Sequence, residues 1–176
     1  GAARMTNING AEIVKRMEQG QVAVITGFPG IGPDKRVSTL GRGGSDTSAV
    51  AVAAALEAAC DIYTDVDGVY TADPRIVTAA QKLDRISYEE MLEQASLGAK
   101  VLQVRSVELG MVRNVRIFVR SSFDKPEDID PLGIPPGTLI CDEEEIVEQQ
   151  VVTGIAFSKD EAQISVRHVP DKPGVA

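Results

Sequence analysis

The residues best suited to chemistry in this chain form one glycine-rich run at positions 41–48, Gly-Arg-Gly-Gly-Ser-Asp-Thr-Ser. Glycines and hydroxyl side chains surround one cation, Arg42, and one anion, Asp46. A run of small apolar residues at 49–56 follows directly, which predicts a loop that opens into a buried helix. The first N–H groups of such a helix lack intrahelical partners and carry partial positive charge, so the junction is suited to binding an anion.

The same run is also consistent with an ordinary glycine-rich turn in which Ser45 or Asp46 caps the helix. Glycine content alone does not separate the two interpretations. Arg42 and Asp46 favour a functional site, because a plain turn requires neither side chain.

Two strands should carry this site. Residues 22–26 are a continuous apolar run, typical of a central strand in a parallel sheet, and they follow a short predicted helix at 11–18. After a predicted helix at 45–59, a second strand is expected at 61–64. Ligands of open α/β sheets bind beyond the carboxyl ends of the strands. We therefore expect the glycine-rich loop and the loop at 64–70 to form two walls of one site.

The loop after this second strand is rich in groups that could hold a ligand. Asp65, Asp67 and Asp73 lack the glutamate and the glycine placement of a calcium-binding loop, and turn formation explains the last two. Tyr70 and Arg75 offer an aromatic face and a guanidinium group, which together suit a nucleotide base and its phosphates.

Two further helices and two further strands are expected in the next part of the chain. Residues 87–90 form a capping box that starts a helix, and a second helix is expected at 100–111. Strands are expected at 115–119 and 137–140. Lys100 would lie near a helix start, where the dipole disfavours a cation. It is therefore either a solvated surface lysine or a contact to a phosphate or base, and its position alone does not decide.

Composition argues against several classes of protein. The 176 residues carry a formal charge of −8, which is unfavourable for nonspecific nucleic-acid binding. His168 is the single histidine, which argues against Ser-His-Asp catalysis and histidine-based zinc sites. Cys60 and Cys141 fit no metal-ligand spacing. Without a secretory signal or an apolar run of about 20 residues, the sequence favours a cytoplasmic location and no membrane partner.

The sequence pattern changes near residue 141. Residues 141–150 are acidic and are expected to form a solvated linker after a first domain at 1–140. Residues 151–176 contain two segments typical of strands, but they are too few to bury a core of their own. We expect them to be half of a second domain or an addition to another sheet.

Three segments together resemble the aspartokinases of the amino-acid kinase superfamily. They are the Gly-Arg-Gly-Gly-Ser-Asp run at 41–46, the segment 63–75 and the segment 95–102, Ala-Ser-Leu-Gly-Ala-Lys-Val-Leu. The segment at 63–75 is also similar to uridylate kinases and glutamate 5-kinases, so by itself it indicates only the superfamily. Residues 171–174, Asp-Lys-Pro-Gly, resemble the strand-to-helix turn of an ACT regulatory domain.

The resemblance implies a fold and a reaction. The fold would be a three-layer α/β sandwich with a mainly parallel central sheet, followed by a truncated α+β ACT-like piece. The reaction would transfer the γ-phosphoryl group of ATP to the side-chain carboxylate of L-aspartate, with Mg²⁺ bound through the phosphates.

The resemblance also implies roles for individual residues. Asp46 would be the catalytic residue, and Arg42 and Ser45, with Gly43 and Gly44, would bind aspartate. The residues that would bind ATP are Thr64, Asp65, Tyr70, Arg75, Lys100 and Val101.

Some features depart from the family pattern. The resemblance implies an N-terminal Lys-x-Gly-Gly-[Ser/Thr] loop that contacts the phosphates, and none occurs here. Gln103 and Val104 replace a His-Pro pair. An effector amino acid, lysine or threonine, and a homo-oligomer through ACT domains are implied as partners. Two alternatives are a uridylate or glutamate 5-kinase and a non-catalytic regulatory or assembly module.

We expect the purified 176-residue chain by itself to form no aspartyl phosphate, because the phosphate-contacting lysine loop is absent from its sequence. The measurement is aspartyl phosphate formation from ATP and aspartate, compared with material purified from cells that carry an empty vector. Product above that background would contradict the expectation.

Overall fold

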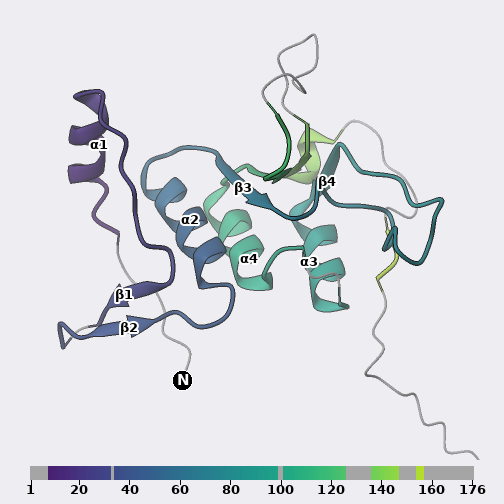
Figure 1. Cartoon of the computed structure of the whole chain (residues 1–176), viewed down its shortest axis with the longest axis horizontal. Coiled ribbons are helices and arrows are strands. Elements are labelled where there is room, and N and C mark those ends of the chain that lie inside the picture. The colour runs from purple at the N-terminus through teal and green to yellow at the C-terminus, as the bar shows by residue number, and fades with distance from the viewer. Residues whose placement is uncertain (1–7, 33, 99–100, 126–135, 147–153, 157–176) are drawn as a thin grey trace, which may run out of the picture.

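The computed structural model describes residues 8–32, 34–98, 101–125, 136–146 and 154–156 (Figure 1). The helices are α1 (Ala11–Glu18), α2 (Gly44–Ala55), α3 (Tyr88–Ser96), α4 (Val104–Arg113) and a 3-10 turn, η2 (Glu143–Glu145). The strands are β1 (Pro29–Ile31), β2 (Val37–Thr39), β3 (Cys60–Thr64), β4 (Arg85–Ser87), β5 (Ile117–Ser121) and β6 (Thr138–Cys141).

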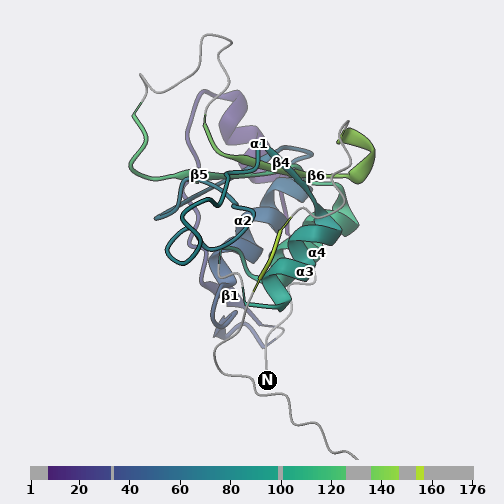
Figure 2. The ribbon, with the colours of Figure 1, turned by 90° about the vertical axis from the view of Figure 1, so that its right-hand side faces the viewer.

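Four strands form the main sheet in the order β3-β5-β6-β4. β3 runs parallel to β5 and β4 runs parallel to β6, whereas β5 and β6 are antiparallel. Helices α2, α3 and α4 lie on one side of this sheet (Figure 2). Because α2 leads into β3 and α4 leads into β5 through short connections, the starts of both helices lie toward the carboxyl ends of these two strands.

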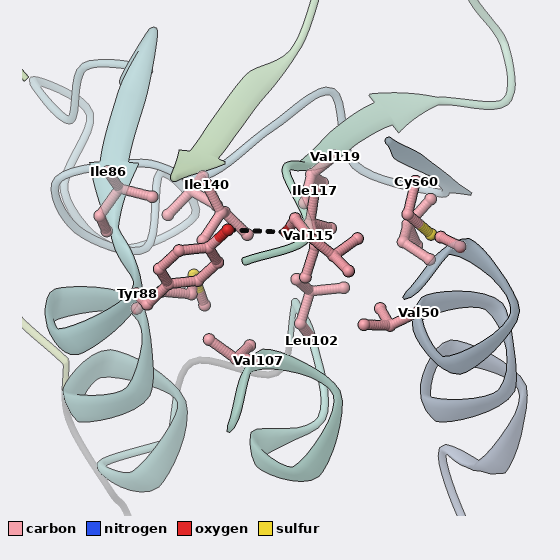
Figure 3. Packing of buried hydrophobic residues seen from close by; sticks show 14 residues of the cluster. Val50, Cys60, Ile86, Tyr88, Leu102, Val107, Val115, Ile117, Val119 and Ile140 are labelled. Atoms are coloured by element: carbon pink, nitrogen blue, oxygen red, sulfur yellow. Dashed lines mark hydrogen bonds between the residues drawn. The ribbon is translucent and has the colours of Figure 1, made fainter. Parts of the chain in front are cut away.

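The core lies between these helices and the sheet, as Figure 3 shows. Val50 of α2, Met91 of α3 and Val107 of α4 are fully buried against the inward-facing strand residues. Those strand residues are Ile62, Ile86, Ile117, Val119 and Ile140. Alternate residues of each strand face the helices, which is the expected pattern when one face of a sheet is covered.

Local sequence signals set the helix boundaries. The Ser87 hydroxyl accepts from the Glu90 N–H at 3.2 Å, and the Glu90 carboxylate accepts from the Ser87 N–H at 3.2 Å, so the expected capping box is confirmed. α1 is followed by Gly20 with φ of +75°, as expected for a helix that ends at a glycine. α2 is shorter than the predicted 45–59, because Glu57 adopts a left-handed φ of +52°.

The prediction of a central strand at residues 22–26 is wrong. Val22 and Val24 are 89% and 94% exposed, and the segment forms no strand in the structure. Apolar residues form a buried strand only where a neighbouring strand completes the hydrogen-bond ladder, and no described strand pairs with this segment. The structure also contains elements that the sequence did not indicate, the antiparallel pair β1–β2 and the short strand β4.

The α/β class and the mostly parallel pairing are confirmed. The strands predicted at 61–64, 115–119 and 137–140 correspond to β3, β5 and β6. The helix predicted at 100–111 begins later, at Val104. Of the expected second domain, only residues 154–156 are described, and the Ile155 N–H donates to the Thr71 carbonyl at 2.7 Å.

Within the described residues, no helix combines the length and apolar character needed to cross a membrane.

The phenol of Tyr88 makes a buried hydrogen bond that should be visible in stability measurements. Its O–H donates to the Val115 carbonyl at 2.7 Å, and burial raises the pKa of Tyr88 to about 12. We expect Tyr88→Phe to lower the free energy of unfolding by about 1–2 kcal/mol, because the buried carbonyl loses its partner. Urea denaturation measures the change, with Tyr63→Phe as a matched control since Tyr63 is 62% exposed. Equal effects of the two variants would contradict this account.

Candidate functional site

The glycine-rich loop adopts a conformation that glycine favours. Gly41 and Gly43 have φ of +85° and +69°, and the Gly44 N–H donates to the Gly41 carbonyl at 3.1 Å. Gly43 is the N-cap of α2 and has no side chain to satisfy the first N–H groups of the helix. The expected junction between loop and helix is therefore present, and backbone donors at the start of α2 remain available to an anion.

The side chains of this loop that were predicted to bind or react lie at its solvent side. Arg42 and Ser45 are exposed and Asp46, in the first turn of α2, is half-buried. The Ser45 hydroxyl donates to the Asp46 carboxylate at 3.5 Å, and Arg42 makes no ion pair with any described residue. Neither Ser45 nor Asp46 caps α2 with its side chain. The interpretation as a plain turn, in which Ser45 or Asp46 caps the helix, is therefore not supported.

The segment before the loop is attached to α2 although it is not a strand. The Ser48 hydroxyl donates to the Gly27 carbonyl at 2.5 Å. A Cβ atom on Gly27 would lie 3.1 Å from both Cα and Cβ of Ser45, so these two residues pack closely. The residue that follows the apolar run at 22–26 thus lies next to the start of α2, although the run itself is not a strand.

The second expected wall begins at the end of β3. Thr64 pairs with Ser121 of β5, and its carbonyl accepts from the N–H and the hydroxyl of Ser122 at 2.8 and 3.0 Å. The Thr64 hydroxyl donates to the Asp65 carboxylate at 3.2 Å, and Asp65 is exposed. These bonds hold the loop after β3 against the loop after β5.

Tyr70 is held by its neighbours in the loop. Its hydroxyl lies 3.1 Å from both carboxylate oxygens of Asp67, and Lys82 Nζ lies 3.5 Å from the same carboxylate. Desolvation, with the hydrogen bond to Asp67 as a second cause, raises the pKa of Tyr70. The phenol therefore stays protonated and fixed to Asp67, and its half-buried ring is oriented at the loop surface.

Arg75 is oriented by a single carboxylate. Its Nε and one terminal nitrogen donate to the two oxygens of Asp73 at 3.0 and 2.9 Å, and the Arg75 backbone N–H also donates to this carboxylate. The Asp73 hydrogen bonds raise the pKa of Arg75, although its side chain is 88% exposed. The guanidinium group is charged, accessible and held in one direction.

The hydroxyl of Thr138 fastens both ends of this loop to the sheet. It accepts from the Val69 N–H at 2.8 Å and donates to the Leu83 carbonyl at 2.6 Å, and Thr138 is fully buried. The Leu83 N–H donates to the Val69 carbonyl at 2.9 Å, which closes the base of the loop. Tyr70 and Arg75 are thus carried by a loop with a fixed base.

Lys100 and Val101 are the last two predicted site residues, and the structure describes only Val101. Lys100 lies outside the described residues. Val101 is half-buried and packs against the core, next to the buried Leu102. Gln103 follows and is the N-cap of α4. A Cβ atom on Gly43 would overlap Cγ and Cδ of Gln103, so the segment that carries Val101 lies against the glycine-rich loop.

The described residues contain no cluster of three or more His, Cys, Asp or Glu side chains arranged to hold a metal ion.

Similarity to known proteins identifies the family of this chain. The sequence model of the amino acid kinase family matches residues 1–121 of this chain. The chain belongs to this family. An aspartate kinase from Pseudomonas fluorescens is 53% identical over 176 residues, covering 99% of this chain and 40% of the relative. This member of the amino acid kinase family thus spans about 40% of the length of that relative.

Solved aspartokinases share the fold of this amino acid kinase chain. Aspartokinase III from E. coli, solved with aspartate and ADP and again with lysine and aspartate, gives TM-scores of 0.64 and 0.62. It is 38% identical over 76% of this chain and 28% of its own. Aspartate kinase from Clostridium acetobutylicum gives a TM-score of 0.68 at 33% identity, over 82% of this chain and 32% of its own.

Sequence reasoning assigned no site role to several residues that orient the predicted site residues. They are Asp67 and Lys82 beside Tyr70, Asp73 beside Arg75, Thr138 beneath the loop, and Gln103 beside Gly43. Sequence analysis interpreted Asp67 and Asp73 as turn-forming residues. It therefore did not predict that they bind the side chains of Tyr70 and Arg75. Thr138 lies 69 residues from Val69 and 55 residues from Leu83, and Gln103 lies 60 residues from Gly43. Local spacing in the sequence therefore could not indicate these contacts.

We expect Thr138→Val to lower the free energy of unfolding by about 2 kcal/mol or more, because two buried backbone groups lose their hydrogen-bond partner. Hydrogen exchange of the Val69 amide should accelerate by more than global stability alone explains. Thr138→Ser retains the hydroxyl and should remain close to the original protein.

Thr78→Val is the matched control, since Thr78 is exposed. Protection of Val69 that is unchanged in Thr138→Val would show that this hydroxyl does not hold the loop.

Proposed function

We propose that the full-length protein is an aspartokinase, which transfers the γ-phosphoryl group of ATP to the side-chain carboxylate of L-aspartate. The observation that carries this proposal is the 53% sequence identity to an aspartate kinase over 99% of this chain. The accessible side chains of the candidate site suit both substrates. Since the chain covers 40% of that relative, the activity is proposed for the whole protein.

The glycine-rich loop is the proposed aspartate site. Arg42 is exposed and has no ion-pair partner among the described residues, so its planar guanidinium can bind a carboxylate with two hydrogen bonds. Ser45 and the backbone of Gly43 and Gly44 surround the start of α2, where the helix dipole favours a negative charge. The solved E. coli relative, which contains aspartate and ADP, supports a site for this substrate.

The loop after β3 is the proposed ATP site. Thr64 and Asp65 lie at its start, Tyr70 presents a ring held by Asp67, and Arg75 presents a charged group held by Asp73. An aromatic face and an oriented guanidinium suit a base and a phosphate chain. Lys100 and Val101 are proposed to complete the nucleotide contacts from the segment before α4.

The chemistry needs no general base. The aspartate side chain is ionised at neutral pH, so a carboxylate oxygen can attack the γ-phosphorus while the bond to the β–γ bridging oxygen breaks and ADP leaves. Positioning and charge neutralisation supply most of the catalysis in such transfers. Mg²⁺ bound to the phosphates would supply part of that neutralisation. Asp46, in the first turn of α2 and beside Ser45, is proposed to organise cationic groups around the transferring phosphoryl group.

The remaining assignments complete the proposal. Residues 1–140 would be the nucleotide-side part of a three-layer kinase domain, 141–150 a linker, and 151–176 the beginning of an ACT domain. Lysine or threonine is the proposed effector, which the lysine complex of the E. coli relative supports. A cytoplasmic homo-oligomer is proposed for the whole protein, without a nucleic-acid or membrane partner.

The full-length gene product should form aspartyl phosphate from ATP and aspartate. We expect Arg42→Ala to lower kcat/KM for aspartate by about 100-fold, because the substrate carboxylate loses a charged partner, and to change the KM for ATP much less. Arg113→Ala, an exposed arginine at the end of α4, is the matched control.

A panel that includes UMP and glutamate distinguishes the alternatives. Phosphorylation of either compound in preference to aspartate would overturn the proposal, and so would binding of lysine or threonine without any kinase activity.

A further inference from the structure

The starts of α2 and α4 meet at one side-chain contact. Gly43 is the N-cap of α2 and Gln103 is the N-cap of α4. A Cβ atom on Gly43 would overlap Cγ and Cδ of Gln103 and would lie 2.9 Å from its Cβ. The glutamine side chain therefore occupies the space that any larger residue at Gly43 would need.

Gln103 is placed by a rigid support. Its carbonyl accepts from the N–H and the hydroxyl of Ser106 at 2.9 and 2.7 Å, and Ser106 is 1% exposed. The preceding residue, Leu102, is buried in the core. The backbone of Gln103 is thus fixed on both sides, although its side chain is largely exposed.

The glycine-rich loop has less support of its own. Leu40 is buried and a Cβ atom on Gly44 would lie 2.7 Å from the Leu40 Cβ, so the loop is fastened at both ends. Between these ends, Gly41, Arg42 and Gly43 are exposed or half-buried, and the two glycines have left-handed φ. Glycine in this region has alternative conformations available unless a neighbour excludes them.

We propose that Gln103 is a positioning residue for the aspartate site, which holds the glycine-rich loop in its binding conformation by packing against Gly43. The inference rests on the proposed aspartokinase function and adds a residue to the same site. Gln103 acts through the loop, and the side-chain atoms nearest to Gly43 are its Cβ, its Cγ and the amide carbon Cδ. Gln103 also brings the glycine-rich loop into contact with the segment that carries Val101. The proposed aspartate site and the proposed ATP site therefore share this contact.

Loss of this contact should affect the affinity for one substrate more than turnover. If truncation of Gln103 lets the loop occupy other conformations, the apparent dissociation constant rises by the inverse of the fraction that remains competent. Once aspartate is bound, the loop is back in place and kcat is retained. A residue with only a structural role would instead lower thermal stability and the amount of active enzyme, and leave KM unchanged.

The experiment uses steady-state kinetics of the full-length gene product. Gln103→Ala should raise KM for aspartate about fivefold to tenfold, within the range of coupling between neighbouring residues, with kcat and the KM for ATP changed less than about twofold. Gln103→Met retains carbon atoms at the contact and should remain close to the original enzyme. Gln19→Ala, an exposed glutamine at the end of α1, is the matched control.

A double-mutant cycle tests the contact itself. Gly43→Ala should impair aspartate binding strongly, because its Cβ would overlap Gln103, and addition of Gln103→Ala should recover part of the loss. Additive effects would overturn the proposal, as would a fall in kcat at unchanged KM or a failure of Gln103→Met to restore KM.

The same cycle separates failure of this inference from failure of the proposed function. If the original enzyme forms no aspartyl phosphate, the proposed function is contradicted, while melting temperatures of the four proteins still test whether Gly43 and Gln103 are coupled. If the enzyme is active and the melting temperatures are additive, the contact is contradicted and the function stands.

Discussion

The parallel pairing of β3 with β5 is the constraint on which the candidate site depends. Each strand is preceded by a helix through a short connection, so pairing of the strands places α2 and α4 side by side against one face of the sheet. The starts of the two helices meet as a result, and Gly43 contacts Gln103. The same register sets Thr64 opposite Ser121, so that the loops after both strands share hydrogen bonds.

Elements with a local start or stop signal were predictable from the sequence. The capping box at Ser87 gave the correct start of α3, because the capping groups are neighbours in the chain. Strands were less predictable, since a strand depends on a partner that is distant in sequence. The apolar run at 22–26 had suitable residues and no pairing neighbour, whereas β4 is only three residues long and forms because β6 lies beside it.

The same distinction between local and distant contacts applies to the candidate site. The glycine-rich loop and the loop carrying Tyr70 and Arg75 were located from residue types and spacing, and the resemblance to aspartokinases supplied their proposed ligands. The groups that orient these side chains were not located, because they act through three-dimensional contacts. Asp67 was explained as a turn residue, and Gln103 was noted only as a departure from the family pattern, with no indication that it covers Gly43.

The fixed base of the loop at Val69 and Leu83 has a consequence for its dynamics. Because Thr138 bonds to both ends, the loop cannot swing away from β6 as a unit without breaking buried hydrogen bonds. Hydrogen bonds between Thr71 and Gln81 extend this attachment, so any remaining displacement is confined to the tip at 72–80, which has turn hydrogen bonds of its own. Tip motions of this kind occur in nanoseconds to microseconds, whereas opening of a whole lid takes microseconds to seconds. The proposed ATP site would therefore adjust to a ligand through small, fast displacements of this tip, without the slow opening of a lid.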